Sequence, residues 1–509
     1  MLRSHSSAIA AFVLRYPKTI AFAAGLVSAT GFAPLSFWPL TILAFAVLIA
    51  LLAEAKTVWR AAGLGWWFGL GQFVLGLNWI ATSFTYQAAM PAWLGWIAVV
   101  LLSLYLALYP LVATVAAWAI ARRYPAVTGL ALAGTWAVGE YLRGTCFTGF
   151  AWNPVGVALV DRSIAGVATV LGTYGLSAMV VLMGWLIAVA VRGPDRRWAY
   201  APAVMLLLLQ GAAALVPPAP QPTRHAPLLH IVQPNIGQQD KWREDFEAQN
   251  FARLASLSGR PGPRPRLLLW PEAAVPDYLE LDALARNRLA ALLGPRDVMM
   301  TGGVSLVTNG TQVTAARNSL FTLDAGGRLL GRYDKAHLVP YGEYLPMRPL
   351  LSALGLSRLA PGDLDFLPGP GPRSVDVPGF GRAGIQICYE MIFSGHVIDD
   401  ADRPSFVFNP SNDAWFGAWG PPQHLAQARL RAIEEGLPVL RSTPTGISAV
   451  IAADGRLEKA LPWRVAGAIE TVLPAPKPPT PFSRLGNILP GLFALALIAA
   501  AIAARWRFA

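Results

Sequence analysis

The sequence has few acidic residues in its first 220 positions. Of the 29 aspartates and glutamates in the 509-residue chain, only Glu54, Glu140, Asp161 and Asp195 lie there. Charged residues amount to 14% of the chain and hydrophobic residues to 54%, whereas soluble domains carry roughly 25% charge. A wholly soluble protein is therefore excluded. We expect a first part embedded in lipid and a later part exposed to water.

Cysteine and histidine are also scarce. The two cysteines, Cys146 and Cys388, lie far apart in the sequence, which argues against a disulfide between them, and they lack the spacing of a metal site. The six histidines are scattered and form no HExxH motif or similar pair. We therefore predict no metal and no other cofactor.

The formal net charge of +12 first suggests a nucleic-acid partner. Many of the basic residues, however, lie in short loops between apolar runs, for example Arg122, Arg123, Arg192, Arg196 and Arg197. Lysine and arginine gather in this way in the cytoplasmic loops of membrane proteins. We therefore predict no nucleic-acid binding and attribute the charge to membrane topology.

Apolar runs of about 20 residues are long enough to cross a bilayer as helices. Such runs cover approximately 18–33, 36–55, 58–83, 91–121, 125–142, 165–192, 198–216 and 487–506. For the first run, Thr19 to Phe32, a cleaved signal peptide is the alternative, but no convincing cleavage site precedes the next apolar run. The sequence therefore predicts eight transmembrane helices.

The basic residues of alternate loops set the predicted orientation. Lysine or arginine precedes the first helix and occupies every second loop, while loops such as FAPLSFWP carry no charge. Both termini are then cytoplasmic. We predict a membrane domain with seven helices (1–216), an outer domain (217–485) and a C-terminal eighth helix (486–509). In a Gram-negative host, the outer domain lies in the periplasm.

The outer segment has the pattern of an α/β domain. The proline-rich stretches VPPAPQPTR and LPAPKPPTP bound a segment of about 250 residues, which is enough for one domain with its own core. Short apolar runs such as RLLLWPE, RAGIQICYE and SFVFNPSN alternate with helical stretches such as QHLAQARLRAIEEG. Strands that alternate with helices indicate an α/β fold.

Three polar residues of this segment stand at or near the ends of apolar runs. Glu272 ends LLLWPE, Lys335 lies in GRYDKAHLVPYGEY and Cys388 ends GIQIC. A polar side chain just past a strand end projects from a rigid edge into any cleft that the sheet supports. Taken singly, each residue has an ordinary alternative: a turn glutamate, a solvated lysine and a core cysteine.

Together, the flanks of these three residues resemble the nitrilase, or carbon–nitrogen hydrolase, superfamily. The resemblance implies an α-β-β-α sandwich with Glu272 as general base, Lys335 as stabiliser of the oxyanion and Cys388 as nucleophile. A carboxylate within hydrogen-bond reach can accept the thiol proton during attack, and a cation can stabilise the oxyanion by roughly 3 kcal/mol. The matching stretches are WPE (270–272), YDKAHLVPYGE (333–343), CYE (388–390) and NPSNDAWFG (409–417).

Neighbouring residues of the same motifs are predicted to support these three. The resemblance implies that the carboxylates of Glu343 and Glu390 hold Lys335 and the surrounding loops in place, and a direct proton-transfer role is the alternative. Tyr389, which follows Cys388, belongs to the same supporting group.

Most of the chain resembles a narrower family, the apolipoprotein N-acyltransferases of bacterial lipoprotein maturation. The additional matches are GEYLRGTCFTGFAWNPVGVAL (139–159), VQPNIGQQDKW (232–242) and DAWFG (413–417). The resemblance implies a ping-pong reaction through a thioester on Cys388. The acyl donor is then a phospholipid, at the sn-1 position of phosphatidylethanolamine, and the acceptor is the α-amino group of a diacylated apolipoprotein. The implied setting is the bilayer of the bacterial inner membrane, with the enzyme as a monomer.

Aromatic and charged residues outside the triad are candidates for substrate contacts. Aromatic rings favour the membrane–water boundary, so four of them are predicted as interfacial or lid residues, with ordinary loop packing as the alternative. A charged pair in or beside the membrane is a functional candidate, with a structural brace for the fifth helix as the alternative. These candidates are Trp242, Trp415, Phe416 and Trp419, and the pair Glu140 and Arg143.

Two other functions compete with acyl transfer. A membrane-tethered amidase would share the triad and use water as the acceptor. That function would not explain the presence of the 139–159 stretch or of the preceding helices. A transporter or scaffold with a decayed nitrilase domain would not need Glu272, Lys335 and Cys388 intact. Release of acid or ammonia would indicate the first, and absence of turnover with an unaltered Cys388 the second.

Overall fold

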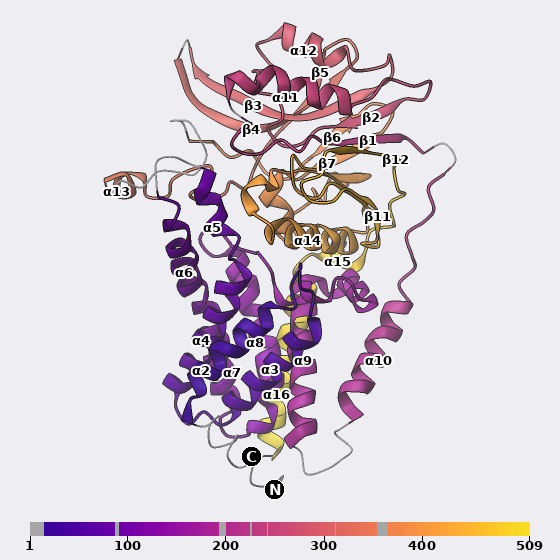
Figure 1. Cartoon of the computed structure of the whole chain (residues 1–509). Helices are drawn as coiled ribbons and strands as arrows, with labels where there is room; N and C mark the ends of the chain where they lie inside the picture. The colour runs from indigo at the N-terminus through magenta and orange to yellow at the C-terminus, as the bar shows by residue number, and fades with distance from the viewer. Residues whose placement is uncertain are drawn as a thin grey trace. The chain divides into compact units, whose positions relative to one another are not determined.

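The computed structural model describes residues 15–86, 91–192, 200–223, 226–241, 243–310, 312–353 and 365–508. The chain divides into two compact units (Figure 1). The helical unit comprises Met1–Asn78, Trp96–Pro217 and Leu485–Ala509. The sandwich unit comprises Trp79–Gly95 and Pro218–Arg484. The short segment Trp79–Gly95 therefore belongs with residues far away in the sequence.

Each predicted apolar run contains helix in the structure. Proline stands in the first turn of α2, α3 and α10, where its missing N–H costs no helical hydrogen bond. The run predicted at 58–83 is not one helix, because α4 ends at Gly76 and a separate short helix follows. The helices are α2 (Pro17–Ala29), α3 (Trp38–Ala53), α4 (Val58–Gly76), α6 (Leu94–Leu106), α7 (Leu108–Ala121), α8 (Thr128–Thr145), α9 (Ala168–Arg192), α10 (Ala201–Ala214) and α16 (Ile488–Phe508).

Within the described residues, three helical stretches are long and apolar enough to cross a membrane: Leu94–Ala121, Ser163–Val191 and Ile488–Arg507. The helices Trp38–Ala53 and Ala201–Ala214 are apolar but shorter. The protein is thus a membrane protein with several apolar helices, while the count of eight crossings stays a prediction.

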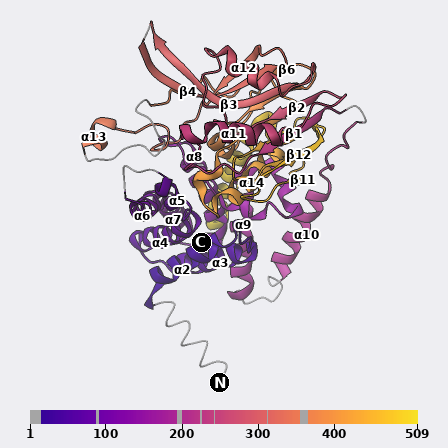
Figure 2. The same ribbon diagram turned by 45° about the horizontal axis from the view of Figure 1, so that its top comes forward.

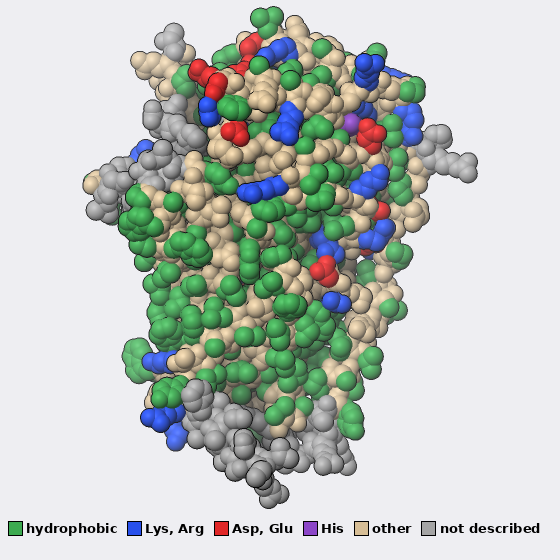
Figure 3. All heavy atoms as spheres, in the orientation of Figure 1, with side chains coloured by type: hydrophobic (Ala, Val, Ile, Leu, Met, Phe, Trp, Pro, Cys, Tyr) green, Lys and Arg blue, Asp and Glu red, His purple; other side chains and the backbone are tan. Residues whose placement is uncertain are grey.

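The surface of the helical unit fits contact with lipid. Hydrophobic side chains cover most of its visible face, whereas charged side chains gather on the sandwich unit (Figure 3). A soluble surface rarely exposes so many large apolar groups together. Examples with at least a third of their surface exposed are Leu43, Leu101, Val112, Leu207, Leu208, Leu492 and Leu495.

The described part of the sandwich unit contains two six-stranded mixed sheets, in the orders β12-β1-β2-β3-β4-β5 and β11-β10-β9-β8-β7-β6. The first consists of β1 (Leu228–Gln233), β2 (Arg266–Leu269), β3 (Val298–Asn309), β4 (Gln312–Asp324), β5 (Leu329–Asp334) and β12 (Gly467–Val472). The second consists of β6 (Ser374–Val377), β7 (Gly381–Ile385), β8 (Phe406–Pro410), β9 (Val439–Ser442), β10 (Ala449–Ile451) and β11 (Leu457–Ala460).

The two sheets pack face to face, and helices cover their outer faces (Figure 1, Figure 2). The Ser442 hydroxyl of β9 donates to the Val232 carbonyl of β1 at 2.9 Å, which joins the sheets. The helices α11 (Glu244–Leu257) and α12 (Ala283–Ala290) share a core with β2, β3 and β4. The helix α14 (Gly420–Glu435) shares another with β8, β9 and β10. The predicted α/β sandwich is confirmed.

The central strands of both sheets end at the site predicted from the sequence. The strands β1, β2 and β3 run parallel, as do β7, β8 and β9. Glu272 lies three residues past β2, Cys388 three past β7, and Lys335 one past β5. Residues at the carboxyl ends of parallel strands share one edge of a sheet, so the topology brings distant motifs together.

Candidate active site

Lys335 is the centre of a buried group of polar side chains. Its Nζ lies 3.4 Å from Glu272 Oε1 and 2.9 Å from Glu343 Oε1. The side-chain amide of Asn318 donates to the same two oxygens, at 2.7 and 2.9 Å. All four residues are less than 9% exposed. Glu272 and Lys335, 63 positions apart in the sequence, are thus in direct contact.

Two carboxylates keep the Lys335 side chain charged. Burial alone would lower the pKa of this lysine, but the carboxylates of Glu343 and Glu272 outweigh burial and raise the pKa above its ordinary value. Lys335 is therefore an ammonium ion enclosed by the protein. A fixed positive charge in a site of low dielectric stabilises negative charge that develops beside it.

Cys388 begins a short 3₁₀ turn, η6 (Cys388–Ile392), and is 5% exposed. Its φ of 51° lies in the left-handed region, which few residues with a side chain adopt. Burial and the negative charge of Glu272 raise the pKa of the thiol to about 12, although Lys335 acts in the opposite direction. The resting side chain is therefore a neutral thiol, and attack by its sulfur requires a base to take the proton.

Comparison with known proteins decides the family. A model of the apolipoprotein N-acyltransferase N-terminal domain matches residues 24–186, and a model of the carbon–nitrogen hydrolases matches residues 229–474. The apolipoprotein N-acyltransferase of Rhodopseudomonas palustris is 36% identical over 505 residues, which cover 94% of this chain and 93% of the relative. The chain belongs to the apolipoprotein N-acyltransferase family.

A second relative agrees with this assignment, and one solved structure is similar to part of the chain. The apolipoprotein N-acyltransferase of Bradyrhizobium diazoefficiens is 38% identical over 494 residues, which cover 92% of this chain and 91% of the relative. A carbon–nitrogen hydrolase superfamily protein of Xanthomonas campestris has 19% identity and a TM-score of 0.35, and the match covers 56% of this chain and 95% of that one. The protein is an apolipoprotein N-acyltransferase, an enzyme of the carbon–nitrogen hydrolase superfamily.

Glu390 joins the loop of Lys335 to the turn of Cys388. Its Oε1 accepts from the main-chain N–H groups of Ala336 (2.7 Å) and His337 (3.1 Å) and from the Tyr333 hydroxyl (2.9 Å). Its Oε2 accepts from the Ile387 N–H at 2.6 Å. Burial raises the pKa of Glu390 to about 7. These contacts join the two loops through one carboxylate, and the role of Glu390 in the reaction stays a prediction.

Glu343 and Asn318 complete the surroundings of Lys335. Glu343 Oε2 accepts from the Val339 N–H at 2.9 Å, which fixes the loop that carries both residues. Asn318 was not predicted as a site residue. Its signal in the sequence is weak, because this amide stands between two other polar residues of β4, Arg317 and Ser319. Only the pairing of β4 with β5 brings it to Lys335, since the Lys335 N–H donates to the Asn318 carbonyl at 2.9 Å.

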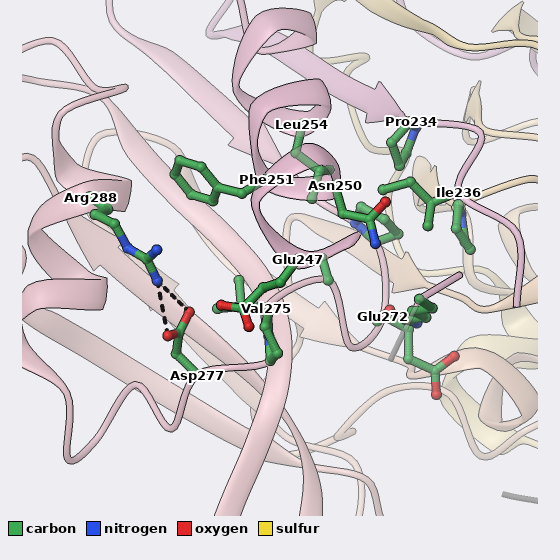
Figure 4. A pocket seen from close by; sticks show the side chains of 15 residues that line it. Pro234, Ile236, Glu247, Asn250, Phe251, Leu254, Glu272, Val275, Asp277 and Arg288 are labelled. Atoms are coloured by element: carbon green, nitrogen blue, oxygen red, sulfur yellow. Dashed lines mark hydrogen bonds and ion pairs between the residues drawn. The ribbon is translucent and has the colours of Figure 1, made fainter. Parts of the chain in front are cut away.

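Lys241 supports Glu272 from the main-chain side. Its Nζ donates to the Glu272 carbonyl at 2.8 Å, and burial of this ammonium lowers its pKa to about 8, although the residue as a whole is partly exposed. The same lysine and Glu272 border a pocket between α11 and the loops that follow β1 and β2 (Figure 4). The Glu272 carboxylate points away from the other labelled side chains of this pocket. The pocket is therefore separate from the Lys335 contact.

Three of the four predicted lid residues, Trp415, Phe416 and Trp419, lie on or near η7 (Asp413–Phe416). Phe416 is buried, and its ring centroid lies 4.6 Å from that of Trp79. The ring centroids of Trp415 and Tyr86 lie 5.9 Å apart, and the Trp415 carbonyl accepts from the Ser83 hydroxyl at 3.0 Å. Trp419 is partly buried, and Trp242 lies outside the described residues. These contacts show packing within the sandwich unit, and a lid role stays a prediction.

Tyr389 is buried beside the nucleophile turn. Its ring lies 5.7 Å from that of His337 and 5.2 Å from that of Phe393. This aromatic cluster packs the loop that follows Lys335 against the turn that follows Cys388.

Glu140 and Arg143 lie in α8 of the helical unit and are both buried. Glu140 Oε1 accepts from the Trp136 indole at 3.0 Å and from the Val155 N–H at 2.8 Å. Arg143 Nη1 donates to the carbonyls of Phe150 and Trp152, both at 2.8 Å. The pair thus holds the segment after α8, and its predicted role toward substrate stays a prediction.

Cys146 and Cys388 are both free cysteines. In the described part of the chain, no group of three or more histidine, cysteine, aspartate or glutamate side chains could hold a metal ion.

Proposed function

We propose that this enzyme carries an acyl chain from a phospholipid to the α-amino group of a diacylated apolipoprotein through a thioester on Cys388. The observation that carries the proposal is the buried contact of Lys335 with Glu272, at 3.4 Å, whose two charges both act on the pKa of the Cys388 thiol. A nucleophile, a base and a cation are the groups that acyl transfer by covalent catalysis needs. The roles of the three residues are part of the proposal.

In the first half-reaction, the Cys388 sulfur attacks the ester carbonyl of the phospholipid. Glu272 takes the thiol proton as the C–S bond forms, because a thiol with a pKa of about 12 does not ionise unaided near neutral pH. The Lys335 ammonium stabilises the tetrahedral oxyanion. When the C–O bond breaks, protonated Glu272 returns its proton to the leaving oxygen, and a lysophospholipid departs.

In the second half-reaction, the neutral α-amino group of the apolipoprotein attacks the thioester. Glu272 accepts a proton from the attacking nitrogen, Lys335 again faces the oxyanion, and the C–S bond breaks. The sulfur regains its proton from Glu272, and an amide is the product. One nucleophile serves both halves, so ping-pong kinetics follow. No nucleotide is required, because the acyl group passes from ester to thioester to amide.

The supporting residues have proposed roles as well. Glu343 and Asn318 hold Lys335 and Glu272 together, and Glu390 and Tyr389 fix the two loops that carry Lys335 and Cys388. The aromatic candidates near Trp415 and the pair Glu140 and Arg143 are proposed to contact lipid or to position the segments that do. The residue types and the motifs that contain them support these last roles.

The membrane setting follows from the substrates. Each buried CH₂ group of an acyl chain gains about 0.8 kcal/mol in lipid, so donor and acceptor do not leave the bilayer readily. We propose phosphatidylethanolamine, with its sn-1 chain, as the donor. We further propose that the chain crosses the bacterial inner membrane eight times, with both termini in the cytoplasm. The catalytic domain (217–485) then lies in the periplasm, between the membrane parts 1–216 and 486–509. We propose that the enzyme is a monomer. The alternation of basic loops and the three long apolar helices support this arrangement.

Intact-mass analysis of the full-length protein incubated with a phospholipid of defined chains tests the proposal. We expect the mass of wild type to rise by one acyl chain, and we expect no increase in Cys388→Ala. Addition of a diacylated lipopeptide should discharge the acyl chain and give N-acylated product. A mass increase that persists in Cys388→Ala contradicts the assigned nucleophile. Free fatty acid as the main product, with the lipopeptide unmodified, would instead indicate a membrane-tethered hydrolase.

A further inference from the structure

A fully buried set of polar side chains lies behind Cys388 and has no part in the reaction described so far. Asp413, His424 and Arg441 are each 0% exposed. They come from three different elements, η7, α14 and β9. Buried polar and charged groups are costly unless they are paired and hydrogen-bonded, so three such side chains at one point of the fold require an explanation.

The three side chains fix one another. Arg441 Nη2 lies 2.5 Å from Asp413 Oδ2 and 3.0 Å from His424 Nδ1. Asp413 Oδ1 lies 3.0 Å from the same His424 nitrogen and accepts from the Ser411 hydroxyl at 2.9 Å. Burial alone would raise the pKa of Asp413, but the charge of Arg441 outweighs burial and lowers it. The aspartate is therefore charged, and the imidazole ring has one orientation.

His424 directs its other nitrogen at the nucleophile turn. Nε2 lies 3.1 Å from the Cys388 carbonyl oxygen. A carbonyl only accepts, so Nε2 carries the hydrogen. Burial, followed by the charge of Arg441, lowers the pKa of His424, which favours the neutral ring. Nδ1 lies 3.0 Å from both Asp413 Oδ1 and Arg441 Nη2, so both charged side chains contact this side of the ring. The charged pair thus holds the ring in the orientation in which Nε2 donates to Cys388.

A second donor reaches the same carbonyl. Asn409 Nδ2 lies 3.5 Å from the Cys388 oxygen and 2.5 Å from the Gln386 oxygen, while its Oδ1 accepts from Arg441 Nη1. Arg441 therefore orients both groups that contact this part of the main chain. The left-handed φ of Cys388 is a costly conformation that persists only where the surroundings hold it.

The Cys388 carbonyl and the Tyr389 N–H are the two ends of one planar peptide unit. A donor that fixes the carbonyl therefore also fixes the direction of the N–H. In hydrolases with a nucleophile on a tight turn, the N–H of the following residue donates to the oxyanion. Control of this peptide unit thus acts on the sulfur and on a potential oxyanion donor at the same time.

We infer that His424 is a positioning residue for acyl transfer: held by Asp413 and Arg441, its Nε2–H clamps the Cys388–Tyr389 peptide in the conformation that the chemical step requires. The inference rests on the proposed role of Cys388 as the nucleophile. It predicts an effect on the rate of thioester formation and none on the affinity for phospholipid.

Two substitutions of His424 separate the contact with Cys388 from the contact with Arg441. In His424→Gln, the amide nitrogen takes the place of Nε2 and can still donate to the Cys388 carbonyl. In His424→Asn, the shorter amide reaches only the place of Nδ1. Single-turnover acylation of the full-length protein by a defined phospholipid is followed by intact mass. We expect His424→Gln to acylate within about tenfold of wild type, the cost of one imperfect hydrogen bond.

For His424→Asn, we expect acylation to slow by about 100-fold, the effect of a misplacement near 1 Å at a reacting centre. The phospholipid concentration that gives half-maximal rate should stay at the wild-type value. His230 provides the matched control, because it is also buried and its Nε2 contacts a main-chain carbonyl, that of Leu257, at 2.7 Å. His230→Gln and His230→Asn should both acylate at the wild-type rate.

The outcomes distinguish this inference from the proposed function. Absence of an acyl adduct on wild-type Cys388 contradicts the proposed function itself. Wild-type rates in a folded His424→Asn, or equal losses in the Gln and Asn variants at unchanged melting temperature, overturn only the inference. If His424→Asn does not fold, His424→Gln decides: acylation within tenfold supports the clamp, and its loss in a folded Gln variant overturns it.

Discussion

At the scale of single residues, the protonation of Cys388 decides how the site works. Enclosed by protein and close to Glu272, the thiol has a pKa near 12, well above that of an ordinary cysteine. Many reactive cysteines are instead activated as preformed thiolates. Here the base must act during attack, so the contact of Glu272 with Lys335 matters as much as the sulfur.

This protonation state predicts the pH dependence of Cys388 alkylation. The thiolate fraction of a group with pKa near 12 rises about 100-fold between pH 8 and 10, whereas that of an ordinary thiol rises about fourfold. The rate at which iodoacetamide alkylates Cys388 checks this pH dependence. It is measured by mass on Cys146→Ser protein without substrate. Free glutathione is the control. A plateau in the rate for Cys388 near pH 9 would contradict the buried-thiol description.

The same shift has a consequence for stability. The folded thiol keeps its proton between about pH 9 and 12, where the unfolded thiol releases it. The unfolded state then binds fewer protons, so this group makes the free energy of unfolding fall as the pH rises through that window. Below about pH 7.5 both states are protonated, and the group contributes no pH dependence.

Removal of the Lys335 charge should destabilise the sandwich unit. Lys335→Met would leave Glu272 and Glu343 buried without their cation, and loss of one partner from a buried ion pair costs about 3–5 kcal/mol. Chemical denaturation followed by tryptophan fluorescence measures the change. Arg288→Met is the control, since Arg288 pairs with Asp277 at a site where the arginine is 47% exposed, and a pair of this kind is worth about 0–1 kcal/mol. Equal losses in the free energy of unfolding of the two variants would contradict a large contribution from the buried cluster around Lys335.

At the scale of elements, the turn η7 connects two parts of the sandwich unit that are distant in the sequence. On one side, its Asp413 belongs to the buried set behind Cys388. On the other, Trp415 and Phe416 pack on the segment formed by α5 (Ile80–Ser83) and η1 (Phe84–Tyr86). A change in the packing of this short segment can therefore reach the nucleophile through one turn.

Gly417 is the position where this packing is tightest. Its φ is +56°, and a Cβ built there would lie 2.7 Å from Thr82 Oγ1. Gly417→Ala should therefore loosen α5 and η1, with a loss of about 1–3 kcal/mol in local stability. Hydrogen exchange of residues 79–86 measures this change, and we expect it to be faster in Gly417→Ala than in wild type.

Gly310→Ala separates the two causes of this loss. Gly310 has a similar φ of +64°, but a Cβ there would meet no atom within 4 Å. Its substitution tests backbone strain alone and should leave exchange in 79–86 unchanged. Unchanged exchange in Gly417→Ala as well would mean that α5 does not depend on this contact.

Strand pairing explains why part of the site escaped prediction. The motifs that contain Glu272, Lys335 and Cys388 are visible because each of these residues follows the end of a strand. Asn318 lies inside a strand, and nothing local marks it. It reaches Lys335 because β4 and β5 pair antiparallel, with Ser319 opposite Asp334. His424 is likewise one polar residue in the helix α14, and its target is 36 residues earlier in the chain.

At the scale of the whole molecule, the proposed topology can be tested by cysteine labelling. In a Cys146→Ser, Cys388→Ser background, Thr308→Cys places a thiol on an exposed end of β3, and Arg123→Cys places one in an exposed loop after α7. A membrane-impermeant maleimide should label Thr308→Cys once the outer membrane is permeable, whereas Arg123→Cys should need disruption of the inner membrane. The reverse pattern would invert the proposed orientation.

The sequence by itself determined the class of molecule and the identity of its reactive groups. Composition, the length of apolar runs and the motifs around Glu272, Lys335 and Cys388 are all local properties of the chain. A membrane protein with an α/β domain and these three candidate residues can therefore be recognised without coordinates. The tertiary structure alone decided what surrounds those groups. The assignment of Trp79–Gly95 to the sandwich unit, the amide of Asn318 at Lys335 and the imidazole of His424 behind Cys388 depend on contacts between distant segments. Such contacts are set by the pairing of strands and the packing of layers, which no local pattern in the chain specifies.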